Sequence, residues 1–405
     1  MPPYCRYALA RSPKQFSSER ALFSQRFKAQ LTRRSGRRLK REDSFPILYM
    51  TLSEREEARG SYDKVDSIEE KGTKSGREGN YAVSRERKKA VVEDWIANAI
   101  QKDVKGIVAE FEKCDKEMNA APVFGDRDNV KNRYRDIGCV EKTRVVLKDV
   151  DVSQNYIHAN YIRSTWCKKR FICTQAPLDT TTEDFWHMVC QEHSDFIVML
   201  CGLVEENCSV CAEYWPQKQG EKLQLQGFEI KNDGFDKIEL VENDRTFTVI
   251  KSKLRVSSRL GIHSCSHFYW SQWADRKGSP SFEIIRLIAR EVRRSRRPTV
   301  VHCSTGVGRT GAFVAIELIL EMLMDGHKCD MPELLRILRN QRAMAINCCE
   351  QYIGVYQQTM LYFEKRKRIP SSYRLQAHEF IERCRKESKC DVNDNTSLIT
   401  REITK

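Results

Sequence analysis

A cysteine and an arginine six residues apart, Cys303 and Arg309, mark the segment of this 405-residue chain whose residue types are best suited to chemistry. The short apolar run 299–301 before them predicts a buried strand, and the apolar run 312–324 after them predicts a helix. The connecting loop contains Gly306, Gly308 and Gly311. These glycines let the backbone curl, so that its N–H groups and the helix N-terminus face one point. The pattern predicts a site for a tetrahedral dianion with a thiol at its floor.

The residue types in this loop suit phosphoryl transfer. A helix N-terminus and nearby cations favour the thiolate form of Cys303, which is the form that attacks as a nucleophile. Arg309 presents a planar fork that binds two phosphate oxygens, and we expect the Thr310 hydroxyl to assist release of a phosphocysteine. His302 is expected to orient the loop rather than to act as a base. The phosphate oxygens are expected to bind along Ser304, Thr305, Gly306, Val307 and Gly308.

The spacing of cysteine and arginine is a weak signal by itself. Cys5 and Arg11 have the same spacing but lack the glycines, the preceding strand and the following helix. For Cys303, the alternative to catalysis is an ordinary buried cysteine in a Gly-rich turn. Other segments of the chain decide between the two interpretations.

Segment 132–363 resembles the classical, non-receptor type of protein-tyrosine phosphatase. Besides the Cys303 loop, six landmarks in family order carry the resemblance: Asn132-Arg133-Tyr134-Arg135-Asp136, Asn155 to Ile162, Thr174-Gln175-Ala176-Pro177, Glu183 to Trp186, Cys211 to Pro216, and Trp273-Ala274-Asp275. The resemblance implies an α/β (α+β) fold, in which a highly twisted mixed β-sheet has helices on both faces. It also implies hydrolysis of phosphotyrosine in proteins through a phosphocysteine on Cys303, without a metal or other cofactor.

The resemblance assigns roles outside the cysteine loop. Tyr134 is expected to form an aromatic wall that makes the pocket deep enough for phosphotyrosine only, and Asp136 to accept hydrogen bonds from substrate backbone. Asp275 is the expected general acid for the phenolate and then the base for water. Glu205 is expected to hold Arg309 in place. Asn347 and Gln351 are the expected positioning residues for the hydrolytic water.

Several positions depart from the family pattern. Ala274 stands where the family has Pro, which frees the backbone of the acid loop, and the stretch to Pro280 is one residue longer. Asn347 replaces Gln, Val210 replaces a common Lys, and Ala176 replaces Gly. These changes predict that hydrolysis of the phosphocysteine is the slow step.

Two other functions remain open at this point. A catalytically weak pseudophosphatase that binds and traps phosphotyrosine proteins fits the departures at Ala274 and Asn347, although Asp275 and Arg309 argue against it. A phosphoinositide phosphatase needs cations in its phosphate loop, and residues 304–308 contain none. The basic run 293–297 has no interleaved aromatic residues, so no nucleic-acid partner is expected.

The pattern of apolar residues predicts alternating strands and helices across the domain. Predicted helices cover 183–193, 282–293, 310–324, 331–342 and 350–367. Predicted strands cover 144–147, 156–162, 171–174, 196–200, 228–231, 237–240, 245–256 and 300–303, and the segment 263–267 alternates like a strand.

The net charge of +14 is concentrated at the N-terminus. Residues 1–41 hold twelve basic residues against one acidic residue, Glu19, and therefore carry +11. A disordered basic arm is the simplest interpretation. A nuclear address read by an import receptor, an acidic-surface contact and a mitochondrial presequence are the alternatives.

The predicted organisation is a basic arm and linker at 1–85, a catalytic domain at 86–365 with leading helices at 87–118, and an exposed polar tail at 366–405. The sixteen cysteines are irregularly spaced and no signal peptide is visible, which favours a reducing compartment and a cytoplasmic location. Cys208 and Cys211 lack the second pair that a zinc site needs. No apolar run reaches the roughly 18 residues of a membrane helix.

Overall fold

A computed structural model describes residues 78–118, 130–164 and 171–389, which belong to one compact unit. The predictions for the basic arm at 1–41, and for most of the linker that follows it, lie outside the described residues. The linker prediction is wrong at its end, because a helix begins at Glu78, nine residues before the predicted start at 87.

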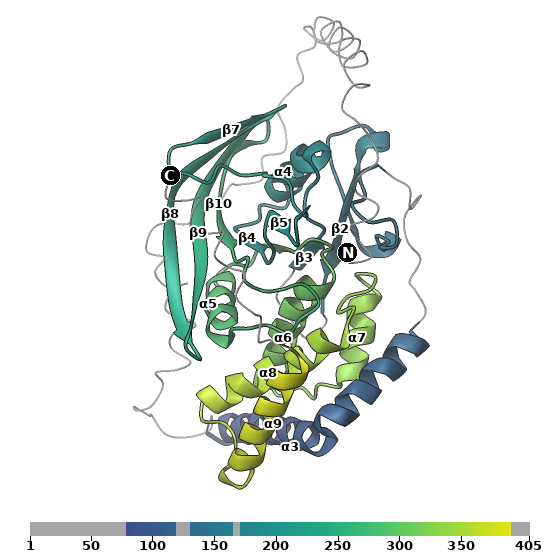
Figure 1. The fold of residues 1–405 in the computed structure, drawn as a ribbon, viewed down its shortest axis with the longest axis vertical. Coiled ribbons are helices and arrows are strands. Elements are labelled where there is room, and N and C mark those ends of the chain that lie inside the picture. Colours follow the sequence, from purple (N-terminus) through teal and green to yellow (C-terminus); the bar gives the residue numbers. More distant parts are fainter. Residues whose placement is uncertain (1–77, 119–129, 165–170, 390–405) are drawn as a thin grey trace, which may run out of the picture. The chain divides into compact units, whose positions relative to one another are not determined.

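The core of the unit is a twisted nine-stranded mixed sheet in the order β1-β2-β3-β11-β4-β10-β9-β8-β7 (Figure 1). The four adjacent strands β3, β11, β4 and β10 are parallel, and the remaining pairs are antiparallel. The strands are β1 (Arg144–Val146), β2 (Tyr156–Ile162), β3 (Phe171–Thr174), β4 (Phe196–Met199), β7 (Lys222–Leu225), β8 (Phe228–Glu242), β9 (Arg245–Ser258), β10 (Gly261–Tyr269) and β11 (Thr299–His302). The short strands β5 (Val204–Glu205) and β6 (Cys208–Ser209) pair separately.

Helices surround this sheet, and α4 to α8 lie within a few residues of the positions that the apolar pattern predicts. They are α3 (Glu78–Glu117), α4 (Thr182–Gln191), α5 (Phe282–Val292), α6 (Gly308–Met324), α7 (Met331–Arg339), α8 (Cys349–Lys365) and α9 (Arg374–Glu387). The Ser281 hydroxyl caps α5 and the Asp330 carboxylate caps α7, because each accepts a free N–H group of the first helical turn.

Neighbouring residues of β10 show that helices cover both faces of the sheet. His267 and Phe268 are consecutive in a strand and therefore point to opposite faces. The His267 ring packs on Tyr214, which packs on Phe185 of α4 with ring centroids 4.7 Å apart. Over Phe268 lies Lys251, whose ammonium group bonds to Glu291 of α5. The predicted fold class is therefore confirmed.

Strands β8 and β9 form a long hairpin along one side of the sheet (Figure 1). The two strands predicted at 228–231 and 237–240 are parts of the single strand β8. An irregularity in the pairing between Asn232 and Gly234 interrupts the ladder between them, which explains why the alternating pattern appears as two short runs.

The leading segment of the domain is one kinked helix, α3, which changes direction at Asp103 (φ 53°, ψ 175°). Its apolar face packs on α8, where the rings of Trp95 and Tyr356 stack with centroids 5.7 Å apart. The hydroxyls of Tyr352 and Tyr356 both donate to the Glu110 carboxylate, at 2.8 and 2.7 Å. These bonds fix α3 to the helix that lies beside the cysteine loop.

The prediction of an exposed polar tail from residue 366 is wrong for 374–387. These residues form α9, which packs against α8 and α3 (Figure 1). Its buried residues, Ala377, Phe380, Ile381 and Cys384, recur at helical spacing on one face. The polar side chains occupy the other face and lower the mean hydropathy of the segment. The apolar pattern in the sequence therefore did not indicate this helix.

Twelve cysteines of the described segments have free thiols. In the same segments, no three metal-binding side chains cluster, and none of their helices has both the length and the apolar composition for a bilayer crossing.

Candidate active site

The predicted phosphate loop connects β11 to α6, with Cys303 completely buried at its start. The Gly306 N–H group donates to the Cys303 sulfur at 3.2 Å. Gly306 has φ 68°, and a Cβ atom there would lie 2.0 Å from the Thr174 carbonyl oxygen, so only glycine fits. The loop therefore curls tightly around the thiol because it packs directly against the end of β3.

Arg309 is completely buried in the first turn of α6 and is held by two carboxylates. Its Nη1 and Nη2 atoms donate to both oxygens of Glu205 at 2.5 and 2.8 Å, and Nη1 also donates to the Trp273 carbonyl at 2.9 Å. Burial lowers the pKa of the guanidinium, but Glu205 and Asp275 outweigh it and raise that pKa well above its ordinary value. Arg309 therefore stays charged, and its Nε has no partner among the described residues.

The acid loop, defined here as residues 273–280, lies over the phosphate loop. The Asp275 carboxylate is 3.3 Å from Arg309 Nη2, and its side chain is 40% exposed. Trp273 is buried and donates from its indole nitrogen to the Lys277 carbonyl at 2.9 Å, which closes the loop on itself. The predicted nucleophile loop, arginine and acid thus meet at one place.

The far end of the acid loop is held from behind by α8 and α9. The Gly278 N–H group donates to the Ser388 carbonyl oxygen at 3.0 Å, just beyond α9. Gln358 of α8 donates to the Ser279 carbonyl at 3.1 Å, and the Cys348 thiol donates to the Arg276 carbonyl at 3.4 Å. The helix that the sequence did not predict therefore contacts the loop that carries Asp275.

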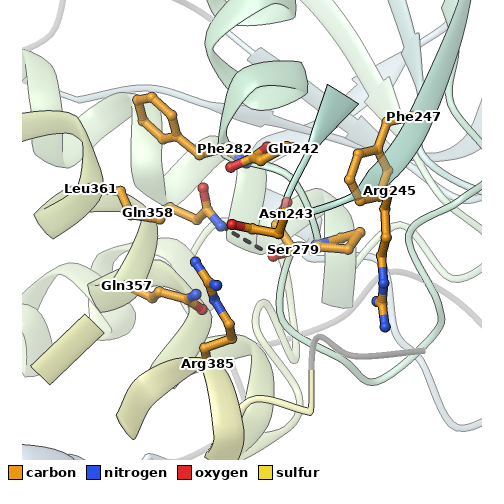
Figure 2. A pocket seen from close by; sticks show the side chains of 11 residues that line it. Glu242, Asn243, Arg245, Phe247, Ser279, Phe282, Gln357, Gln358, Leu361 and Arg385 are labelled. Atoms are coloured by element: carbon orange, nitrogen blue, oxygen red, sulfur yellow. Dashed lines mark hydrogen bonds between the residues drawn. The ribbon is translucent and has the colours of Figure 1, made fainter. Parts of the chain in front are cut away.

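Behind this loop end lies a cavity of about 130 Å³ (Figure 2). It is bounded by the tip of the β8–β9 hairpin, by Ser279, by Gln357 and Gln358 of α8 and by Arg385 of α9. Figure 2 shows the bond from Gln358 to Ser279 beside it. None of its lining residues belongs to the phosphate loop, so this cavity is separate from the thiol site.

Tyr134 stands beside the phosphate loop, as the resemblance implies. Its hydroxyl lies 2.6 Å from the Ser304 hydroxyl, and burial raises the pKa of the phenol. The preceding residue, Arg133, fixes this segment by donating to the carbonyls of Ala176 and Pro177 at 3.2 and 2.6 Å. Asp136 is exposed, where an incoming peptide can reach it.

Asn347 and Gln351 lie against the start of α6. A Cβ atom on Gly308 would be 2.6 Å from Gln351 Nε2 and 3.0 Å from Asn347 Oδ1, so glycine leaves the space that these amides occupy. Gln351 is completely buried, yet both its amide atoms lack partners within the described residues. The structure therefore brings both amides together at the start of α6.

Thr310 follows Arg309 in the first turn of α6. Its buried hydroxyl has no hydrogen-bond partner within the described segments, and the hydroxyl recorded against the Cys303 sulfur is that of Thr305, at 3.7 Å. The remaining loop residues, Ser304, Val307 and Gly308, are buried around the thiol.

His302 lies under the loop in a chain of buried hydrogen bonds. Its Nδ1 faces the Cys303 carbonyl at 3.3 Å, and its Nε2 is 2.7 Å from the Tyr214 hydroxyl. That hydroxyl is also 2.7 Å from Nε2 of His267. Burial lowers the pKa of His302 to about 3, so the ring is neutral, and its hydrogen bonds hold it beneath the loop.

Arg342 is a residue of this site that the sequence analysis missed. It is completely buried beneath the loop and donates to the carbonyls of Thr305 and Gly306, both at 3.1 Å, and to the Asn160 side chain at 2.9 Å. The sequence placed Arg342 at the end of a helix, where arginine is ordinarily exposed. Only the fold brings the loop carbonyls to it.

Comparison with known proteins identifies the family of this chain. The family model described as protein-tyrosine phosphatase matches residues 128–361, which is more than half of the chain. Tyrosine-protein phosphatase 69D of Drosophila melanogaster is 34% identical over 236 residues, covering 56% of this chain and 16% of that protein. Tyrosine-protein phosphatase non-receptor type 20 of Mus musculus is 28% identical over 310 residues, covering 74% of this chain and 70% of that protein.

A solved structure of PTPN18 in complex with HER2 phosphopeptides has the same fold, with a TM-score of 0.57 and 27% identity. The match covers 64% of this chain and 99% of that one. The chain spans less than a fifth of the length of the first curated relatives, 16% and 18%, so the match concerns the domain. On the family model and this fold, the chain belongs to the classical protein-tyrosine phosphatase family.

Proposed function

We propose that this protein hydrolyses phosphotyrosine in proteins, with Cys303 as the nucleophile. The observation that supports this most directly is the meeting of three groups: the buried thiol, the charged Arg309 and the Asp275 carboxylate 3.3 Å from that arginine. In this proposal a phosphate binds to the N–H groups of the loop, whose Gly306 N–H already points to the Cys303 sulfur, and to the Arg309 Nε, which has no partner within the described residues.

The proposed reaction has two steps. In the first, the Cys303 sulfur bonds to phosphorus, the bond from phosphorus to the tyrosine oxygen breaks, and Asp275 gives its proton to the leaving phenolate. In the second, Asp275 takes a proton from water, the water oxygen bonds to phosphorus, and the sulfur leaves. Asn347 and Gln351 position that water in this proposal, and Thr310 assists the departure of the sulfur.

The substrate class follows from the wall at Tyr134. A thiol that is completely buried is reached by a long phosphorylated side chain, and the ring of Tyr134 offers a face for an aromatic substrate. Asp136, exposed near this wall, is proposed to accept hydrogen bonds from the substrate backbone. Phosphotyrosine-containing proteins are therefore the proposed partners, and signal transduction is the proposed role.

The test is hydrolysis of a phosphotyrosine peptide and of the matched phosphoserine peptide by the full chain under reducing conditions. We expect release of phosphate from the first peptide only, and its loss in Cys303→Ser with binding retained. Tight binding of the phosphotyrosine peptide by the unaltered protein without phosphate release identifies the alternative, a pseudophosphatase that traps phosphoproteins.

Location in the cytoplasm is proposed separately and is tested by imaging the full chain in cells.

A further inference from the structure

The ends of α5 and α8 carry a concentration of positive charge that the proposed reaction does not use. Residues 290–297 contain five arginines and Glu291, and residues 364–368 contain four cations and Glu364. Together these two segments, called here the basic end, carry +7. Residues 42–405 carry only +3 in total, because +11 of the +14 lies in residues 1–41. The rest of residues 42–405 therefore carries −4, so positive charge is segregated onto one surface.

Contacts show that the two segments lie side by side. Arg293 at the end of α5 bonds to Glu317 of α6 at 2.7 and 3.0 Å, and it also hydrogen-bonds to Tyr362 of α8. The guanidinium of Arg366 lies over the same Tyr362 ring, 5.6 Å from its centroid. Arg368 reaches the sulfur of Met324 at the end of α6. The basic end is therefore one continuous surface over three helix termini.

Most of these cations are exposed and unneutralised. The side chains of Arg290 and Arg294 are 63% and 66% exposed and share one acid, Glu291, which also binds Lys251. The side chains of Arg296, Arg297, Lys365 and Lys367 are exposed and form no ion pair within the described segments. The helix dipole stabilises cations near helix C-termini. That stabilisation does not explain why so many cations are gathered on one surface.

The basic end lies away from the phosphate loop. Helix α6 begins at the loop and α8 begins beside it, and each runs for 17 residues, which corresponds to about 25 Å. Helix α5 begins next to the acid loop, and its last residues lead into the start of β11. A partner bound at the basic end therefore leaves the mouth over Cys303 open.

We propose that the basic end is a docking surface for an anionic lipid bilayer. A bilayer matches a broad, exposed group of cations with no groove, and each Lys or Arg near such a surface adds to its attraction. Tyr362 is buried beneath Arg293 and Arg366, so the surface offers no aromatic ring for stacking on nucleic-acid bases. Residues 1–41 add +11 of the same sign, which increases the attraction of the whole chain to an anionic surface.

The test is co-sedimentation of the full chain with vesicles of pure phosphatidylcholine and with vesicles that contain about 30 mol% phosphatidylserine. We compare the unaltered protein with the variant R294E/R296E/K365E/K367E. The matched control is K142E/K148E/K222E/K237E, which makes the same charge change at exposed lysines next to β1 and on β7 and β8, at the two opposite edges of the sheet. Hydrolysis of a small phosphate ester serves as the folding control, because the basic end is far from the loop.

We expect the first variant to lose at least about tenfold in partitioning to the anionic vesicles, and the control variant to change by less than about twofold. Raising the ionic strength to about 0.5 M should release the unaltered protein. Equal loss in both variants shows that only net charge matters and overturns the proposal. Binding to pure phosphatidylcholine also overturns it, as does a preference for duplex DNA or polyglutamate over the anionic vesicles.

Discussion

The two loops that meet at the Arg309–Asp275 contact are built in opposite ways. The phosphate loop is buried throughout: the side chain of Arg309 is 0% exposed, and Arg342 binds the loop carbonyls from below. The acid loop has a carboxylate that is 40% exposed, and it is held at its back by single hydrogen bonds to α8 and α9. One loop is a fixed part of the core, and the other is a surface segment docked onto it.

In the proposed mechanism, this difference separates the two chemical steps. The departures from the family pattern at Ala274 and Asn347 fall on the acid loop and on the proposed water-positioning pair, whereas the phosphate loop keeps its thiol, glycines and arginine. Attack by Cys303 is proposed to depend mainly on the fixed loop. Hydrolysis of the phosphocysteine is proposed to depend on the acid loop and the amides, so we expect the departures to slow that step.

The largest expected effect is that of Arg309→Lys, which attacks the fixed loop. Lysine replaces a bidentate fork with a point charge and removes the paired bonds to Glu205. We expect kcat/KM for a phosphotyrosine peptide to fall by about 10³-fold. Arg290→Lys, an exposed arginine on α5, is the control and should change the rate little. A fall of less than about tenfold in Arg309→Lys contradicts the role given to the guanidinium.

The next effect is on stability and concerns the support of the acid loop. Phe380 is completely buried in α9, and Phe380→Ala should lower the free energy of unfolding by about 3–4 kcal/mol. Leu375→Ala changes a 69% exposed side chain on the same helix and should cost less than about 0.5 kcal/mol. Urea denaturation measures both. Equal costs show that α9 does not pack on the domain.

A smaller effect is the pH dependence of stability that His302 contributes. Burial lowers the pKa of His302 to about 3 in the folded state, whereas it is about 6.5 in the unfolded chain. As pH falls below about 6.5, the unfolded state binds the proton first and stability is lost. Between about pH 7.5 and pH 5.5 the loss from this residue is about 1.4 kcal/mol.

His302→Asn should remove that part of the pH dependence in denaturation curves at the two pH values. Leu375→Ala, which changes an exposed side chain and removes no titratable group, is the control and should leave the slope unchanged. An unaltered slope in His302→Asn means that the imidazole is accessible to protons in the folded state.

The smallest effect is expected from restoring a family residue in the acid loop. Ala274→Pro restricts the backbone of this loop and so lowers the entropy cost of ordering it, which should raise steady turnover by about two- to fivefold. Asn347→Gln lengthens the amide by one methylene and should raise phosphocysteine hydrolysis by a similar factor. A drop in turnover in both variants shows that this chain has adapted to Ala274 and Asn347 as they are.

The sequence predicts the fixed loop better than its surroundings, for physical reasons. A strand, a Gly-rich turn and an apolar helix are local features, so the path from β11 through Cys303 to α6 is visible in consecutive residues. Burial of Arg342 depends on carbonyls of residues 305 and 306, far away in the sequence, and no local pattern indicates it. Helix α9 had a signal, the spacing of Ala377, Phe380, Ile381 and Cys384, but its charged outer face masked it.

The measurement that tests the account most directly is rapid mixing of the full chain with a phosphotyrosine peptide, following tyrosine and phosphate release separately under reducing conditions. The account predicts a burst of tyrosine equal to the enzyme concentration, then slow release of phosphate at the steady rate, with both lost in Cys303→Ser. Tyrosine and phosphate appearing together without a burst would contradict it, because hydrolysis of the phosphocysteine would then not be slow.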